Sequence, residues 1–129
     1  MKKILLLDDN TIACERSIRQ LERKYEVCRC KEILIAARRL KIIKFDLLII
    51  DLMMPTKGLN TTDEFNAGFA FYNQYVNNDR KGIPVIFWTN LSNNSFNAFY
   101  ENHQQSNLLH YLQKSDDEMA LLNLVNQLI

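Results

Sequence analysis

Glycine and proline are scarce in this chain, with three and two residues among 129. Because both residue types interrupt helices and strands, their scarcity favours regular secondary structure over long loops. Cysteine is sparse too, and Cys14, Cys28 and Cys30 form an odd set without the paired spacing of a disulfide framework. No histidine lies near them in sequence to complete a zinc site, so we interpret all three as reduced, partly buried thiols.

The sequence also lacks the patterns of several functional classes. No apolar run is long enough to span a bilayer, and the first residues do not form a signal peptide. The formal net charge is +1, so global charge predicts binding to neither nucleic acid nor membrane. No glycine-rich phosphate loop follows the first expected strand, which argues against a nucleotide-binding protein. Length and composition predict a single globular domain, which we place in the cytoplasm.

Short apolar stretches predict five β-strands. Residues 47–50 are entirely apolar and are followed by Asp51 and Pro55, as expected of a strand that is buried on both faces of a parallel sheet. The stretch at residues 25–30 is less hydrophobic and is expected at an edge of the sheet. The other expected strands are residues 4–7, 85–88 and 108–112.

Helical spacing of apolar residues alternates with these strands. The expected helices are residues 11–23, 31–44, 64–78, 92–102 and a last helix that starts at Ser115. This alternation predicts a doubly wound α/β fold with a five-stranded parallel sheet and right-handed crossovers, in one domain covering residues 1–129.

Finer features of two helices also follow from the spacing. The first helix is expected to bury Ile12, Ile18 and Leu21, and the third to bury Phe65, Phe69, Tyr72 and Val76. Capping boxes are expected at Thr61 with Glu64 and at Ser115 with Glu118.

Polar residues follow four of the expected strands: Asp8 and Asp9, Asp51, Thr89, and Lys114. Because the carboxyl ends of parallel strands share one edge of the sheet, these side chains are expected to meet there. Three nearby carboxylates repel one another unless a cation is present, and an all-oxygen ligand set suits Mg²⁺. A metal ion, an ammonium group and a hydroxyl can hold the oxygens of a phosphoryl group. The pattern therefore predicts that Asp51 is a nucleophile that forms an aspartyl phosphate.

With Asp8-Asp9, Asp51-x-x-Met-Pro, Thr89 and Lys114 in this order, the chain resembles the receiver domain of two-component response regulators, especially single-domain receivers of the chemotaxis-regulator type. The resemblance covers nearly the whole chain. It implies a (βα)5 flavodoxin-like fold with the strand order 2-1-3-4-5.

The resemblance also implies a role for individual residues. Asp51 would be the phosphoacceptor. Mg²⁺ would be bound by three carboxylates and one backbone carbonyl, those of Asp8, Asp9, Asp51 and Met53. The phosphoryl oxygens would be held by Thr89, the backbone of Asn90, and Lys114. Thr89 and Tyr111 would form a switch in which Tyr111 follows the movement of Thr89, although Tyr111 can equally be a half-buried strand residue with its hydroxyl in water.

The partners implied by the resemblance are a histidine kinase or phosphotransfer protein and a downstream protein target. A small acyl phosphate could also donate the phosphoryl group. No output domain is expected within these residues, and we expect a monomer or weak dimer that turns over no outside substrate. An enzyme with an aspartyl-phosphate intermediate commonly needs a second acid two residues after the nucleophile, where this chain has Met53.

The sequence departs from the family pattern beside Asp51. Gly68 matches a glycine that usually follows the proline much more closely, which predicts an insertion of about nine residues within 56–67. Asn90 stands where alanine or glycine is usual, and Ser115 where proline is usual. These departures keep open an alternative, a receiver-like protein-interaction module that is not phosphorylated.

Overall fold

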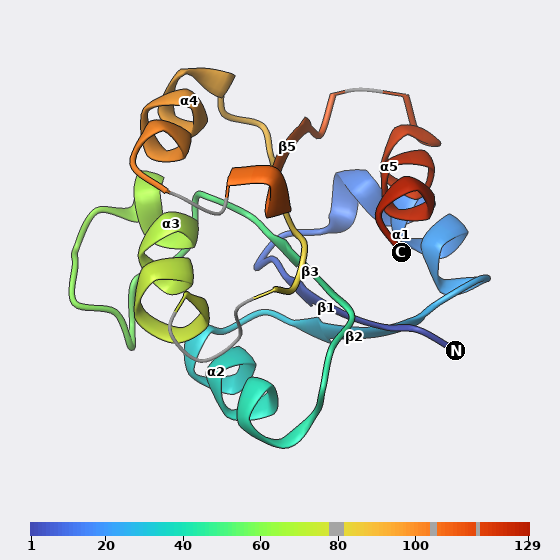
Figure 1. Cartoon of the computed structure of the whole chain (residues 1–129), viewed down its shortest axis with the longest axis horizontal. Coiled ribbons are helices and arrows are strands. Elements are labelled where there is room, and N and C mark those ends of the chain that lie inside the picture. Colours follow the sequence, from blue (N-terminus) through green and yellow to red (C-terminus); the bar gives the residue numbers. More distant parts are fainter. Residues whose placement is uncertain (78–81, 104–105, 116) are drawn as a thin grey trace.

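The computed structural model describes residues 1–77, 82–103, 106–115 and 117–129, and it forms a parallel sheet between two layers of helices (Figure 1). The strands lie in the order β2-β1-β3-β4-β5. Their bounds are Lys3–Leu7 (β1), Glu26–Cys30 (β2), Leu47–Ile50 (β3), Val85–Thr89 (β4) and Leu109–Gln113 (β5). The predicted doubly wound, flavodoxin-like fold and the edge position of β2 are confirmed, and each strand begins and ends within one residue of its prediction.

Strand β3 lies at the centre of the sheet, paired with β1 on one side and β4 on the other. All four of its side chains are buried, which explains why the sequence of this strand is apolar without alternation. Burial of each such side chain contributes about 1.5–3 kcal/mol, so β3 is a major source of stability.

Helices cover both faces of the sheet (Figure 1). Helices α1 and α5 pack on one face, and α2, α3 and α4 pack on the other. The bounds are Glu15–Glu22 (α1), Ile33–Ile42 (α2), Ala67–Phe71 (α3), Asn93–Glu101 (α4) and Ala120–Leu128 (α5). Short 3₁₀ turns occupy Ile12–Cys14, Glu64–Asn66 and Ser106–Leu108, and a π-helical turn at Tyr72–Val76 continues α3. The predicted end of the third helix at residue 78 lies outside the described residues.

Two side chains that were expected in the core are instead exposed. Ile18 and Leu21 of α1 are buried, but Ile12 is 86% exposed. Phe69 is buried, but Phe65 is 61% exposed. Both exceptions lie in the 3₁₀ turn that precedes the α-helix, where the angle between successive residues differs from the α-helical one. The apolar face therefore does not extend back to these positions.

The predicted capping boxes are not the caps that form. At the start of the 3₁₀ turn before α3, the side chain of Asp63, rather than that of Thr61, accepts a hydrogen bond from the Phe65 amide at 3.1 Å. Helix α5 begins at Ala120, so Ser115 does not start it. There the carboxylate of Asp117 accepts a hydrogen bond from the Met119 amide at 2.8 Å. In both places an aspartate carboxylate accepts a hydrogen bond from the amide two residues later, and this local cap forms instead of the predicted capping box.

The three cysteines are free thiols, as predicted. A membrane-spanning helix would require a longer apolar stretch than any helix in the described part of the chain provides.

Candidate functional site

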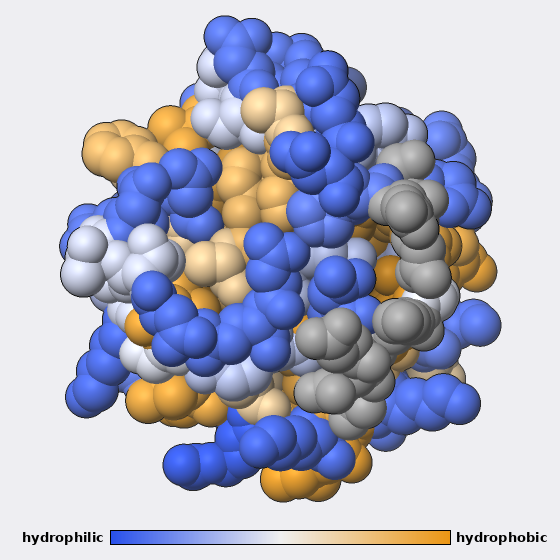
Figure 2. Space-filling model, turned by 60° about the vertical axis from the view of Figure 1, so that its left-hand side comes forward, coloured by the Kyte–Doolittle hydropathy of each residue, from blue (hydrophilic) through white to orange (hydrophobic). Residues whose placement is uncertain are grey.

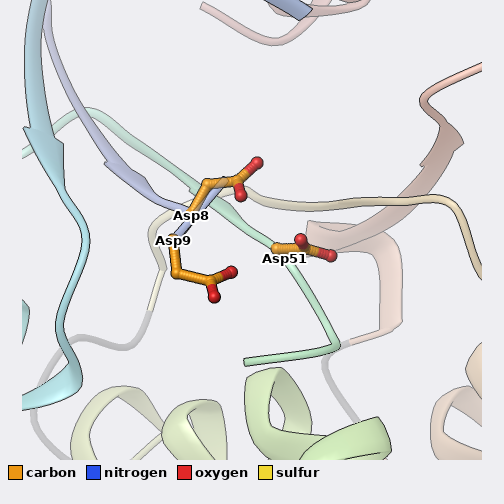
Figure 3. Close-up of side chains that lie close together, drawn as sticks. All are labelled: Asp8, Asp9 and Asp51. Carbon is orange, nitrogen blue, oxygen red and sulfur yellow. The ribbon is translucent and has the colours of Figure 1, made fainter. Parts of the chain in front are cut away.

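Three carboxylates gather at the carboxyl edge of the sheet, in the arrangement that the strand ends predict. Asp8 and Asp9 follow β1, and Asp51 follows β3, its neighbour in the sheet. The Asp51 amide donates a hydrogen bond to the carbonyl of Leu7 at 2.9 Å, which fixes the two strand ends side by side. One carboxylate oxygen from each of the three aspartates lies within 4.8 Å of the other two (Figure 3).

Lys114 supplies a buried positive charge to this cluster. Its Nζ lies 2.5 Å from Asp8 Oδ2 and 3.0 Å from Asp51 Oδ2, and the lysine side chain is only 5% exposed. The backbone positions it, because the Lys114 amide donates a hydrogen bond to the carbonyl of Thr89 at 2.8 Å. The end of β5 therefore carries the ammonium group to the two strand ends that carry the acids.

The charges of this cluster depend on one another. Burial raises the pKa of Asp8 to about 6, although the nearby Lys114 and the Asn10 amide act in the opposite direction. Burial alone would lower the pKa of Lys114, but the carboxylates of Asp8 and Asp51 outweigh it, so the pKa of Lys114 is raised. The ammonium therefore stays charged at neutral pH, and it favours the negative charge of Asp8 because it lowers the pKa that burial raises.

The donor set of this cluster fits a hard divalent cation. Asp8, Asp9 and Asp51 offer carboxylate oxygens and no sulfur or nitrogen, which is the ligand chemistry of Mg²⁺. Asp8 Oδ2 is buried and has an ion pair with Lys114 but no hydrogen bond of normal geometry within the described residues. The residues present therefore have both the oxygen ligands and the excess negative charge that such an ion needs.

A shallow cavity of about 260 Å³ opens beside Asp51. Several residues that were predicted at the site line it, namely Asp9, Asp51, Met53, Asn90 and Lys114. Its other lining residues are Asn10, Met54, Pro55 and Glu64. The cavity gives a ligand access to the carboxylate of Asp51, which is 7% exposed as a residue.

Thr89 and Tyr111 do not line this cavity, but both contact the same residue, Leu91. The Thr89 hydroxyl, which is buried, accepts a hydrogen bond from the Leu91 amide at 3.3 Å. The Tyr111 hydroxyl donates a hydrogen bond to the Leu91 carbonyl at 2.5 Å. The alternative in which the Tyr111 hydroxyl lies in water is therefore wrong, and a short backbone segment connects the two predicted switch residues.

Gly68 holds the first turn of α3 against the strand end that carries Asp51. Its amide donates a hydrogen bond to the carbonyl of Leu52 at 3.0 Å. A Cβ atom at this position would lie 2.3 Å from the Asp51 carbonyl oxygen and 2.9 Å from Leu52 Cα, so only glycine allows this approach. The glycine that was matched to the family by sequence thus contacts the backbone of Asp51.

The segment at residues 56–63, which forms no helix or strand, is tied to its surroundings. The carbonyl of Gly58 accepts hydrogen bonds from Tyr75 Oη at 2.6 Å and from Gln74 Nε2 at 3.1 Å. Gly58 has a φ of +97°, and a Cβ there would lie 2.7 Å from the Leu34 side chain of α2. The segment therefore lies against α2 and is hydrogen-bonded to the turn that continues α3 (Figure 1).

Glu64 and Trp88 are two residues near the site that the sequence did not point to. Glu64 lines the cavity because its carbonyl accepts a hydrogen bond from the Met54 amide at 3.1 Å. The ring of Trp88 lies 5.4 Å from Lys114 Nζ, measured to its centroid. The position of Trp88 could have been inferred from the sequence, because Trp88 directly precedes Thr89 at the carboxyl end of β4. The sequence pattern of Glu64 indicates only a helix start, and nothing in it indicates that Glu64 lines the cavity.

Met53, which lines the cavity, and Phe65, which follows the lining residue Glu64, are exposed apolar residues on either side of the 56–63 segment. On the side of the molecule that carries α3, apolar residues occur in small areas between hydrophilic ones (Figure 2). Scattered exposed apolar residues are common on soluble proteins, so they do not define a site by themselves.

The chain matches no protein-family model and no curated protein, but its structure is similar to many solved ones. It superposes on the chemotaxis response regulator CheY4 of Vibrio cholerae with a TM-score of 0.74 and 21% identity, over 100% of this chain and 99% of that one. The response regulator TrrA of Thermotoga maritima, solved with Mg²⁺ and BeF, superposes with a TM-score of 0.71 and 23% identity, over 100% of both chains. The BeF3-activated DrrB receiver domain superposes with a TM-score of 0.73 and 18% identity, over 99% of this chain and 97% of that one.

These structures share their fold with this chain over its full length. The fold is therefore that of the receiver domains of response regulators, as the sequence resemblance implied.

Proposed function

We propose that this chain is a phosphoacceptor receiver of a two-component phosphorelay, phosphorylated on Asp51. The observation that carries the proposal is the contact of Lys114 Nζ with carboxylate oxygens of both Asp8 and Asp51, beside a cavity that reaches Asp51. An acid with an adjacent buried ammonium, in an open cavity at the carboxyl edge of a parallel sheet, suits nucleophilic transfer of an anionic group.

In the proposed reaction, a carboxylate oxygen of Asp51 attacks the phosphorus of a phosphohistidine or an acyl phosphate. The new O–P bond forms as the P–N or P–O bond of the donor breaks, and the donor leaves with the electron pair of that bond. Lys114 and the Asn90 backbone hold the phosphoryl oxygens at the cavity, and Thr89, which does not line the cavity, moves towards these oxygens to hold them as well. Asp8, Asp9, Asp51 and the Met53 carbonyl would hold Mg²⁺, which would supply positive charge to the phosphoryl oxygens.

The receiver fold supports this assignment, and the Mg²⁺–BeF complex of TrrA and the BeF3-activated DrrB receiver indicate which reagents to test. We further propose that a histidine kinase or phosphotransfer protein is the donor, that the phosphorylated state changes a protein-contact surface through Thr89 and Tyr111, and that the protein turns over no outside substrate. A protein target then reads that surface.

The experiment is to incubate the full chain with phosphoramidate or acetyl phosphate, with and without Mg²⁺, and to measure its intact mass. We expect a gain of one phosphoryl group that requires Mg²⁺ and is absent from Asp51→Asn. No gain in the wild type, with Mg²⁺ binding shown separately by calorimetry, would contradict the proposal and favour a receiver-like module that binds partners without phosphorylation. Glu26→Gln, on β2, is the matched control for loss of one carboxylate charge.

A further inference from the structure

One acid of the cavity has no part in the proposed phosphorylation. Of the acidic residues that line the cavity, Asp9 and Asp51 belong to the proposed metal and phosphoryl site, whereas Glu64 does not. Within the described residues, the Glu64 carboxylate makes no hydrogen bond or ion pair. Glu64 is a lining residue of the cavity and its carboxylate is bound to no other described side chain, so the carboxylate is available to a molecule that enters the cavity.

The backbone holds Glu64 in place independently of its carboxylate. Its carbonyl accepts the hydrogen bond of the Met54 amide, and the cap formed by Asp63 fixes the turn that Glu64 begins. Asn66 Nδ2 donates a further hydrogen bond to Asp63 Oδ2 at 2.7 Å. Substitution of the Glu64 side chain would therefore leave these backbone contacts intact.

The remaining lining of the cavity contains no other general base. Met53, Met54 and Pro55 are apolar, and the amides of Asn10 and Asn90 do not accept a proton at neutral pH. Lys114 is a cation that contacts Asp8 and Asp51. Among the described residues, Glu64 is thus the carboxylate at this cavity that could take a proton from a water molecule without leaving the proposed metal site.

We infer that Glu64 is the general base that hydrolyses the aspartyl phosphate of Asp51, so that the segment before α3 sets the lifetime of the phosphorylated state. This inference rests on the proposed function and deepens it. The water oxygen attacks phosphorus as Glu64 takes a proton from the water. The new O–P bond forms, the P–O bond to Asp51 breaks, and Asp51 leaves as a carboxylate. The products are inorganic phosphate and free Asp51, and the proton on Glu64 passes to solvent.

The test measures decay of the phosphorylated protein separately from its formation. The full chain is phosphorylated with phosphoramidate and Mg²⁺, the donor is removed by desalting, and the phosphorylated fraction is followed by intact mass. We expect Glu64→Gln and Glu64→Ala to be phosphorylated like the wild type but to decay about a hundredfold more slowly, the lower end of the range of general-base effects. Glu64→Asp, which keeps the carboxylate, should recover part of the rate, and Glu26→Gln should decay like the wild type.

A solvent isotope effect separates a base from a structural role. Decay of the wild type in D₂O should be slower than in H₂O, and this ratio should fall in Glu64→Gln, while thermal unfolding of the two proteins stays the same. Wild-type or faster decay in both Glu64→Gln and Glu64→Ala would overturn the inference and leave the proposed function standing. Absence of phosphorylation in the wild type would instead overturn the proposed function and this inference with it.

Discussion

Lys114 Nζ lies 2.5 Å from Asp8 Oδ2, and the same nitrogen donates a hydrogen bond to Asp51 Oδ2 at 3.0 Å. One buried ammonium thus contacts two carboxylates that follow adjacent strands and offsets only one of their two negative charges. A divalent cation that binds these carboxylates would compete with Lys114 for them and would weaken the existing ion pairs. The site is therefore expected to respond to metal through the position of the lysine.

The pKa of Asp8 predicts how stability depends on pH in the absence of divalent cations. Burial raises this pKa from 3.8 to about 6, so between these values the native protein holds a proton that the unfolded chain has released. The free energy of unfolding contributed by Asp8 therefore falls as pH rises from about 4 to 6, by on the order of 2–3 kcal/mol. Urea unfolding of the wild type and Asp8→Asn in a chelator, from pH 4 to 7.5, measures this.

We expect the free energy of unfolding of the wild type to fall relative to that of Asp8→Asn as the pH rises across this range. Asp46→Asn is the matched control, since its carboxylate accepts a hydrogen bond from the Lys3 amide on the exposed amino-terminal side of the sheet. A difference between wild type and Asp8→Asn that is independent of pH would show that Asp8 titrates normally in the folded protein.

Trp88 should report the binding of Mg²⁺ by its fluorescence. It is the single tryptophan, it is buried, and Lys114 Nζ lies 5.4 Å from its ring centroid. If Mg²⁺ displaces the ammonium from Asp8, the charge near the indole changes, so emission should change in a saturable way. Asp9→Asn should weaken this response and Glu26→Gln should not. The same response to NaCl at equal ionic strength would mean that Trp88 senses screening and not a bound cation.

Gly68→Ala should destabilise the protein and disturb the metal site together. The added Cβ would lie 2.3 Å from the Asp51 carbonyl oxygen, so the backbone of α3 or of the β3 end must shift. Overpacking of this kind costs about 1–3 kcal/mol, and the shift should also weaken the Trp88 response to Mg²⁺. Urea unfolding and fluorescence titration measure the two effects.

Gly82→Ala is the control for this substitution. Gly82 has a φ of +89° but no atom within 4 Å of its missing Cβ, so alanine there should cost about 1–2 kcal/mol through backbone strain alone. Its response to Mg²⁺ should equal that of the wild type. Equal Mg²⁺ responses in Gly68→Ala and the wild type would show that the contact with Asp51 does not position the site.

The sheet and its order could be predicted because each strand is marked by its own composition. Residues 47–50 are apolar throughout and are followed by an acid, which indicates both burial and the carboxyl end of the strand. Since parallel strands end at one edge, Asp8, Asp51 and Lys114 could be expected to meet before any contact was known, and the structure brings them together.

Features that depend on the path of a connection could not be predicted. Ile12 and Phe65 fit the apolar spacing of the helices that follow them, but each lies in a 3₁₀ turn and is exposed. The approach of Glu64 to the cavity depends on its backbone hydrogen bond with Met54, which involves no side-chain pattern. Local periodicity indicates which face of a helix is buried, but not where an irregular segment returns to the sheet.

Tyr111→Phe should destabilise the protein by about 1 kcal/mol, because it leaves the carbonyl of Leu91 without the hydrogen bond that the tyrosine hydroxyl donates at 2.5 Å. Tyr100→Phe is a matched control. Both tyrosine rings lie near Phe96, with centroid distances of 5.7 Å for Tyr111 and 5.5 Å for Tyr100, but Tyr100 is partly exposed and its hydroxyl has no hydrogen bond to another described residue. Urea unfolding of both variants at one pH separates the contribution of the Tyr111 hydrogen bond to stability from the general effect of removing a tyrosine hydroxyl.

The same pair of variants tests whether the Leu91 segment links Tyr111 to Thr89. The Leu91 amide donates to the Thr89 hydroxyl, so a change in the position of its carbonyl should alter the end of β4, which also carries Trp88. We expect Tyr111→Phe to change the Trp88 emission produced by Mg²⁺ with BeF3, and Tyr100→Phe to leave it unchanged. If both variants respond like the wild type while only Tyr111→Phe is destabilised, the hydroxyl stabilises the fold but does not couple β5 to the site.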